Sequence, residues 1–209
     1  MTPLLLLDYA GVAVFAATGA LAASRKQMDI VSFLFLGGVT GIGGGTVRDV
    51  ILDAPVFWLT SSGYVLVCVV VGFAVYFGAH RLESRYRLLL WLDAVGMAAY
   101  SVVGAAKGLA ATGSPVVAVI TGMLTATFGG ILRDVLTGEP SVLLRPEIYV
   151  TAALAGSVTY IIVNPAGMPL VAAAAAFMVA FIVRGGALRF GWKIPVYKTR
   201  PGRSPGDID

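Results

Sequence analysis

The sequence predicts an all-α membrane protein in which seven transmembrane helices form two inverted three-helix repeats plus a seventh helix. Its composition is the first reason: apolar residues make up 58% and charged residues 12% of the 209 residues, against about 45–50% and about 25% in soluble domains. Second, the apolar residues form blocks of about 20 residues, the length that a helix needs to cross a bilayer. Third, the chain repeats itself internally. A soluble enzyme is therefore excluded, and no catalytic activity is expected.

The apolar blocks predict seven spans, and these must be helices because isolated strands would leave backbone amides unsatisfied in lipid. The first block is a span and not a cleaved signal peptide, because no Lys or Arg precedes Arg25 and because Asp8 interrupts it. Residues 1–184 then form one transmembrane domain, and residues 185–209 form a basic cytoplasmic tail. The predicted spans are 3–23, 30–52, 57–79, 88–106, 115–136, 147–163 and 167–183.

The distribution of basic residues predicts the orientation. Twelve Lys and Arg residues fall on one side of the seven spans, and only Lys107 falls on the other. Because basic loops stay in the cytoplasm, we expect the N-terminus outside and the C-terminus inside, in a prokaryotic cytoplasmic (inner) membrane. The same rule explains the net charge of +4, so membrane lipid is the expected partner and nucleic acid is not. With one cysteine, Cys68, and one histidine, His80, no metal site and no cofactor are expected.

The internal repeat keeps one constant register without a gap. Repeat one covers residues 3–79 and repeat two covers residues 88–163. Because each repeat has three spans, an odd number, the second must begin on the opposite face of the membrane from the first. Inverted repeats of this kind build solute pathways whose site lies near the membrane midplane. The matched pairs include Asp8 with Asp93, Gly19 with Gly104, Gly44-Gly45 with Gly129-Gly130, Arg48-Asp49 with Arg133-Asp134, Pro55 with Pro140, and Tyr64 with Tyr149.

Glycines interrupt the second and fifth spans near their middle. Each glycine costs a helix about 1 kcal/mol relative to alanine, so we expect a kink or an unwound turn in each span. Irregular backbone at this depth is tolerated where it lines a wet cavity. Close packing of neighbouring helices through small residues is an equally open explanation. The residues concerned are Gly43, Gly44 and Gly45 in the first repeat and Gly129 and Gly130 in the second.

Six charged residues lie within the predicted spans at matched positions. Each costs about 2.5–3.5 kcal/mol near the bilayer centre and therefore faces protein or water. Their depths predict two ion pairs within the repeats, Asp8 with Arg48 and Asp93 with Arg133. Asp49 and Asp134 are turned by about 100° from the neighbouring arginines and are expected to face elsewhere. The alternative is that all six residues only hold helices together.

The sum of these charges bears on selectivity. Four aspartates against two arginines leave a net charge of −2 within the membrane, which favours cations. Lys107, at the outer end of the fourth span, is either an anchor that reaches to the membrane surface or a charge of an outer vestibule or gate.

The second and fifth spans carry matched motifs, Gly43-Gly-Gly-Thr-Val-Arg-Asp49 and Gly129-Gly-Ile-Leu-Arg-Asp134. With these motifs, seven spans and inverted repeats, the sequence resembles the prokaryotic members of the trimeric intracellular cation channel family. Bacterial members of that family are also labelled as a glycine-transporter-like domain. The resemblance covers residues 4–184. It implies a homotrimer with a pore in each protomer, lined by the second and fifth helices and conducting monovalent cations, chiefly potassium.

Carried over from the family, the glycines of the two motifs would be hinges, and Arg48 and Arg133 would be charges associated with the pore. The sequence departs from the family in two ways. Phe128 stands where a third glycine would complete the second triplet, and the Lys-Glu-Val motif of the animal channels is absent. Equal bending of the two helices and the lipid and calcium regulation of the animal channels are therefore not implied.

The sequence thus predicts a passive channel for potassium or sodium ions, in which aspartates favour cations and Arg48 or Arg133 gates the path. A different hypothesis is a secondary transporter of a small zwitterion such as glycine, whose carboxylate would be held by half-helix amides. A third is a structural membrane protein without flux.

Overall fold

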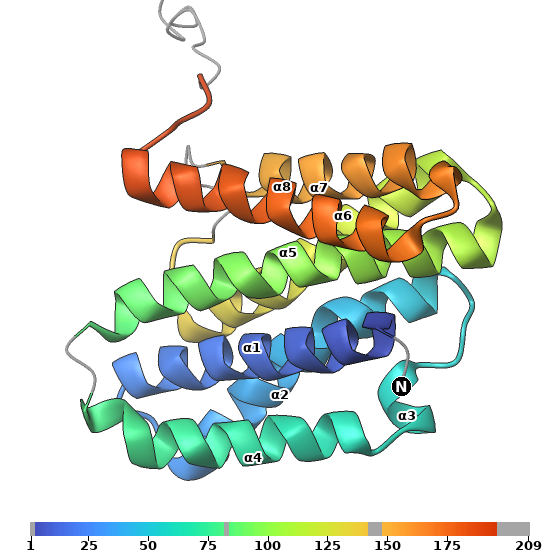
Figure 1. Ribbon diagram of the computed structural model, residues 1–209. Helices are drawn as coiled ribbons and strands as arrows, with labels where there is room; N and C mark the ends of the chain where they lie inside the picture. The colour runs from blue at the N-terminus through green and yellow to red at the C-terminus, as the bar shows by residue number, and fades with distance from the viewer. Residues whose placement is uncertain (1–2, 82–83, 142–147, 196–209) are drawn as a thin grey trace, which may run out of the picture.

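The computed structural model describes residues 3–81, 84–141 and 148–195, and these form a bundle of helices. The helices run nearly side by side, with α7 and α8 on one side of the bundle and α4 on the opposite side (Figure 1). Among these described residues, six helical segments are long and apolar enough to cross a membrane, and α7 is a shorter apolar helix. The elements are α1 (Pro3–Arg25), α2 (Ile30–Ile51), α3 (Phe57–Thr60), α4 (Gly63–Gly78), the 3₁₀ turn η1 (Ala79–Arg81), α5 (Arg85–Thr112), α6 (Pro115–Thr137), α7 (Val150–Val163), the 3₁₀ turn η3 (Asn164–Ala166) and α8 (Pro169–Phe190).

Three predicted spans differ from the helices observed. The span 57–79 is divided into the four-residue helix α3 and the longer α4. The span 88–106 is part of the 28-residue helix α5, which ends only where Gly113 takes a left-handed conformation with φ of 65°. The span 167–183 continues to Phe190, so the first residues of the predicted tail are helical. Apolar runs alone underestimate helices whose ends carry polar or small residues.

Local side-chain hydrogen bonds begin several of these helices. Ser114 accepts the backbone N–H of Val117 at the start of α6, and Ser84 accepts that of Arg87 at the start of α5. At the start of α2, the carboxylate of Asp29 accepts the N–H of Ser32 at 2.8 Å. This hydrogen bond to the charged form holds the pKa of Asp29 below its usual value. Such caps satisfy amides that the first turn of a helix leaves unpaired.

The helices pack in matching ways in the two halves of the chain. Helix α1 contacts α2 and α4, and α5 likewise contacts α6 and α7. The halves meet through α1 against α5 and through α2 against α6. Helix α8 adds to the outside of the second half, on α5 and α7 (Figure 1).

The centre of the molecule is the crossing of α2 and α6, where two glycines make reciprocal contacts. A methyl group on Gly44 would overlap the carbonyl oxygen of Thr125, and one on Gly129 would overlap the carbonyl oxygen of Thr40. Both helices are continuous through their glycines, so the predicted unwound turn is wrong. Close packing is the role that these two glycines have in this conformation.

A second reciprocal contact lies between α1 and α5. A methyl group on Gly11 would meet the ring of Tyr100, and one on Gly96 would meet the ring of Phe15. The two rings stack with their centroids 5.3 Å apart. Each contact recurs in the other half in the register of the internal repeat, in which Gly11 matches Gly96 and Phe15 matches Tyr100.

Candidate functional site

Two groups of charged side chains are buried in the bundle, one on each side of the α2–α6 crossing. The Asp8 cluster consists of Asp8, Arg48, Asp49 and Lys107. The Asp93 cluster consists of Asp93, Arg133, Asp134 and Arg184. All except Lys107 are between 0% and 5% exposed. Charges are buried to this degree only when they are paired, so the partners of each side chain decide what the clusters can do.

In the Asp8 cluster, α1 and α5 are joined by an ion pair across the two repeats. The Nζ atom of Lys107 donates to Oδ2 of Asp8 at 2.8 Å, and the hydroxyl of Tyr64 donates to the same oxygen at 3.3 Å. The side chain of Lys107 is 32% exposed, whereas that of Asp8 is 3% exposed. Lys107 is therefore neither a free vestibule charge nor a surface anchor, but the cation that neutralises a buried carboxylate.

The predicted pair of Asp8 with Arg48 is wrong. Instead, Nε of Arg48 donates to Oδ1 of the adjacent Asp49 at 2.8 Å, and Nη2 lies 2.7 Å from the same oxygen. The other oxygen of Asp49 accepts the backbone N–H of Phe57 at 2.9 Å. The turn into α3 thus orients the Asp49 carboxylate, and Lys107 takes the place at Asp8 that depth alone assigned to Arg48.

The ring of Phe57 connects the cations of this cluster. It lies 5.6 Å from the guanidinium carbon of Arg48 and 5.3 Å from Nζ of Lys107. Both distances are within the range of cation–π attraction. Two buried polar atoms, Oδ1 of Asp8 and Nη1 of Arg48, have no hydrogen-bond partner among the described residues. A water molecule or an ion at these atoms would remove the cost of burying them.

In the Asp93 cluster, the predicted pair of Asp93 with Arg133 is present. Nη1 of Arg133 donates to Oδ1 of Asp93 at 2.7 Å. Nε and Nη2 of the same guanidinium donate to Oδ1 of Asp134 at 3.0 and 2.9 Å. The expectation that Asp134 faces elsewhere is therefore wrong, as it is for Asp49, because each carboxylate turns back to the preceding arginine.

Arg184 of α8 is the fourth member of this cluster. Its guanidinium lies 5.1 Å from the centre of the Tyr149 ring, and its Nη1 donates to the carbonyl of Ile148 at 3.2 Å. Sequence reasoning missed this residue because the predicted helix ended at 183. The run of small residues that follows, Gly185-Gly186-Ala187, is buried and was the signal that the helix continues into the protein.

The charge balance changes with Lys107 and Arg184 included. Four aspartates now face four cations, two in each cluster, so the predicted sum of −2 does not hold for this conformation. The formal charges of these two clusters therefore do not by themselves favour cations in this conformation.

A small opening leads from the end of α1 and α6 to the Asp93 cluster. It ends at Arg133 and Asp134, and Glu139 lies at its entrance. The carboxylate of Glu139 lies 3.5 Å from Nη2 of Arg25 and 3.3 Å from Nζ of Lys26. Ala22 also lines this opening, and the residue that matches it in the second repeat is Lys107. At matching positions of the two repeats, the small side chain of Ala22 therefore lines the opening at the Asp93 cluster, whereas Lys107 forms an ion pair in the Asp8 cluster.

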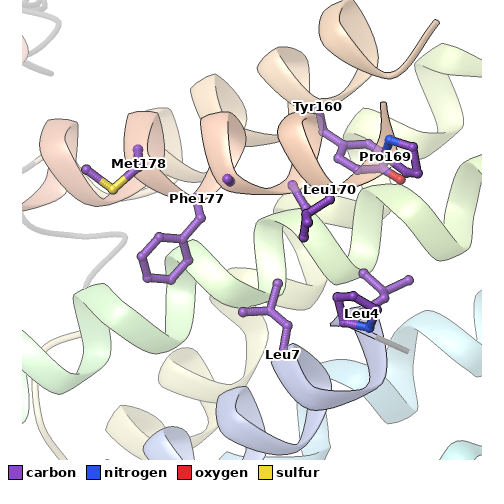
Figure 2. Close-up of a pocket in the computed structure, with 10 residues that line it drawn as sticks. Leu4, Leu7, Tyr160, Pro169, Leu170, Phe177 and Met178 are labelled. Atoms are coloured by element: carbon purple, nitrogen blue, oxygen red, sulfur yellow. The ribbon is translucent and has the colours of Figure 1, made fainter. Parts of the chain in front are cut away.

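An apolar hollow of about 610 Å³ lies apart from both clusters, between α1, α7 and α8 (Figure 2). Leu4 and Leu7 of α1 line it from one side, and Leu170, Phe177 and Met178 of α8 line it from the other. No charged residue lines it, so it is not a path for ions.

Known membrane proteins share the sequence and the fold of this chain. A family model described as "Glycine transporter" matches residues 5–80 and again residues 90–165, and the two matches keep the register of the internal repeat. The inner membrane protein YadS of Escherichia coli is 37% identical over 198 residues, which cover 91% of this chain and 94% of that protein. The trimeric intracellular cation channel orthologue from Rhodobacter sphaeroides has a TM-score of 0.89 at 49% identity, covering 92% of this chain and 100% of that one.

The chain is a prokaryotic member of the trimeric intracellular cation channel family. A crystal structure of another prokaryotic channel of the family, in 0.5 M KCl, has a TM-score of 0.85 at 27% identity, covering 91% of this chain and 98% of that one. The matched proteins are membrane proteins and cation channels. Like them, this member of the family is an integral protein of the inner membrane and not an enzyme.

Proposed function

We propose that this protein conducts monovalent cations, chiefly potassium, through a pore within each protomer. The path would run from the Asp8 cluster, between α2 and α6 at Gly44 and Gly129, to the Asp93 cluster. The observation that carries this proposal is that buried, charged side chains lie on both sides of a helix crossing made of glycines. Two solved relatives at 30% identity or more, which are named as cation channels, support it.

The proposed topology is seven spans in two inverted repeats, with the N-terminus outside, assembled as a homotrimer. The reciprocal contacts of Gly44 with Thr125 and of Gly129 with Thr40 support the inverted repeat, because a two-fold relation exchanges them. The Rhodobacter sphaeroides relative is named as a trimeric channel, which supports the homotrimer. The orientation rests on the excess of basic residues at one end.

In the proposed mechanism, the conformation in which α2 and α6 are in contact is the closed channel. The backbones of α2 and α6 are in contact at the crossing, so conduction requires them to separate. In the proposed mechanism the hinges for this movement are Gly43, Gly44 and Gly45 with Gly129 and Gly130. Continuous helices would bend there because glycine is the least costly residue at which to change the backbone angles.

We assign the gate to Lys107, and not to Arg48 or Arg133. Each arginine is almost fully buried and makes at least two contacts with carboxylate oxygen, whereas Lys107 is partly exposed and has Asp8 as its one ion-pair partner among the described residues. With the N-terminus outside, an inside-negative potential drives this cation inward towards Asp8 and favours the closed state. A full charge moved across 100 mV changes the free energy by about 2.3 kcal/mol.

Movement of Lys107 also explains cation preference. The Asp8 cluster is neutral while the lysine is bound, and it carries a net charge of −1 when the lysine leaves. Oδ1 of Asp8, which has no hydrogen-bond partner among the described residues, then faces the path together with Oδ2. The open state would thus attract a cation at the position that Lys107 vacates.

Planar-bilayer recording of the purified protein tests this function. We expect unitary currents whose reversal potential follows a potassium gradient. Lys107→Met should raise the open probability by up to roughly fivefold, because a partly exposed ion pair contributes about 0.2–1 kcal/mol to the closed state. Lys107→Arg, which keeps the charge, is the matched control. Asp8→Asn in the Lys107→Met background should reduce the preference for potassium over chloride.

Other outcomes would contradict the proposal. Saturable glycine counterflow without unitary currents would identify a transporter. If neither signal is seen, and thermal unfolding shows that the protein is folded, a structural role would be favoured.

A further inference from the structure

A hollow of about 560 Å³ lies where the first turns of α5 meet the last turns of α8. It is remote from the α2–α6 crossing, and it contains no member of the Asp8 or Asp93 cluster. Its size is within the usual range for small-molecule sites. The residues that line it are Ser84, Tyr86, Arg87, Leu90, Trp91, Leu188 and Arg189.

The rim of this hollow carries two arginines from different helices, Arg87 and Arg189. Both side chains are exposed, and neither has an ion-pair partner within residues 3–81, 84–141 and 148–195. Other cations at this end of the bundle are engaged differently: Arg25 and Lys26 share the carboxylate of Glu139. Two guanidinium groups that line one hollow, with no carboxylate paired to them among the described residues, favour a ligand with negative charge.

The floor of the hollow is apolar, and its apolar surface continues along the bundle. Trp91 of α5 lies 6.2 Å from Phe181 of α8, measured between ring centroids, and Phe181 stacks on Phe177 at 6.1 Å. These three rings form a row that leads from the hollow towards the middle of α8. A ligand that covers both the rim and this row must have a charged end and a long apolar part.

We propose that this hollow binds an anionic phospholipid, with its phosphate between Arg87 and Arg189 and one acyl chain along the row from Trp91 to Phe177. Guanidinium groups bind phosphate with paired hydrogen bonds. Basic pockets between the ends of transmembrane helices are suited to the headgroups of anionic lipids. The hydroxyl of Ser84, which accepts the N–H of Arg87 at 3.4 Å, keeps its own proton available for a phosphate oxygen.

A membrane lipid fits this site better than free phosphate does. Inorganic phosphate would contact only the rim and would leave Leu90, Trp91 and Leu188 uncovered. A lipid is already held at the depth of the helix ends, and its acyl chain can pack on the row of rings while its headgroup contacts the arginines. The site requires only that these ends lie at the membrane surface, so it does not depend on the proposed pore.

Native mass spectrometry and thermal unfolding of the full chain in detergent can test the site. Phosphatidylglycerol should stay bound and should raise the unfolding temperature more than phosphatidylcholine with the same acyl chains. Arg87→Gln with Arg189→Gln should weaken phosphatidylglycerol binding at least tenfold. The matched control is Arg81→Gln with Lys193→Gln, which removes the same charge from exposed residues outside the hollow and should change binding less than twofold.

Two further measurements separate the lipid from its headgroup. Inorganic phosphate at the same concentration should give no protection, and Phe181→Ala should weaken lipid binding while leaving both arginines in place. Phosphatidylglycerol binding that is unchanged in the double arginine variant would overturn the proposal. Equal protection by inorganic phosphate would show a free-anion site. A change of oligomer mass in the double arginine variant, without a change of lipid binding, would show a contact between copies of the chain. Either result would also overturn the proposal. None of these readouts uses ion current, so a failed channel experiment would leave the lipid site standing.

Discussion

The Asp8 and Asp93 clusters are built from matching residues of two repeats, yet they hold their charges differently. In both, an aspartate of the first helix lies near an Arg-Asp pair of the second. Asp93 is held by Arg133, which is almost fully buried and also binds Asp134. Asp8 is held by Lys107, which comes from the other repeat and is partly exposed. The repeat thus supplies the same carboxylates twice, but a buried arginine holds one and a partly exposed lysine holds the other. We therefore expect the Asp93 cluster to be rigid and the Asp8 cluster to be the end that opens.

The surroundings of the two clusters also differ, because α8 packs at the Asp93 cluster. Arg184 of α8 adds a second buried cation above Tyr149 in the Asp93 cluster. Among the described residues, no helix corresponding to α8 follows the first repeat. In the Asp8 cluster, the ring of Phe57 lies within cation–π distance of both cations. An added helix outside the repeat therefore makes the symmetry incomplete, and it does so on the side that we expect to be static.

Arg133→Leu should have the largest effect on stability. It leaves the carboxylates of Asp93 and Asp134 buried without their shared cation, and removing one partner of a buried pair costs about 3–5 kcal/mol. Lys107→Met also removes the cation of a buried aspartate, but the Lys107 side chain is itself 32% exposed, so its cost should be clearly smaller. Thermal unfolding in detergent, followed by tryptophan fluorescence, compares the two variants. Equal losses of stability would show that the two clusters are equally rigid.

The next largest effect is expected at the crossing that joins the two halves. In Gly44→Ala, the added methyl group would overlap the carbonyl oxygen of Thr125, and overpacking of this kind costs about 1–3 kcal/mol. Gly129→Ala should cost the same, because it meets the carbonyl of Thr40 in the matching way. The control is Gly38→Ala on the same helix, which meets nothing within 4 Å and should gain up to about 1 kcal/mol.

Thermal unfolding measures these glycine variants as well. A large difference between Gly44→Ala and Gly129→Ala would show that the crossing is not shared equally by the two repeats. Loss of stability in Gly38→Ala would show that glycine in α2 is needed for something other than close approach.

Much of this arrangement could be predicted from the sequence. The internal repeat keeps one constant register, and the contacts at the centre of the molecule follow the same register. Gly44 meets Thr125 in one half, and the matching residues Gly129 and Thr40 meet in the other. The pair of Asp93 with Arg133 followed from equal depth in adjacent helices. Depth along a helix is readable from the sequence because the rise per residue is constant.

The partners of the other buried charged side chains could not be predicted in the same way. Depth left Asp8 with Arg48, but the turn at Phe57 holds Asp49 against Arg48, and Lys107 reaches Asp8 from a helix that is longer than its apolar run. Arg184 was missed for a related reason, since a charged residue reads as the end of a span unless its burial is known. Both errors concern tertiary contacts between the repeats or with α8, which no local pattern specifies.

The smallest effect is expected at the entrance to the Asp93 cluster. Glu139→Gln removes the carboxylate that Arg25 and Lys26 share, and their side chains are 22–37% exposed. Ion pairs of this kind contribute about 0.2–1 kcal/mol, and salt weakens them. The loss of unfolding temperature should therefore be small in low salt and absent near 1 M salt, whereas that of Arg133→Leu should persist. A Glu139→Gln effect as large and as resistant to salt as that of Arg133→Leu would place this entrance within the buried network, and the contrast between a rigid interior and a weakly closed entrance would not hold.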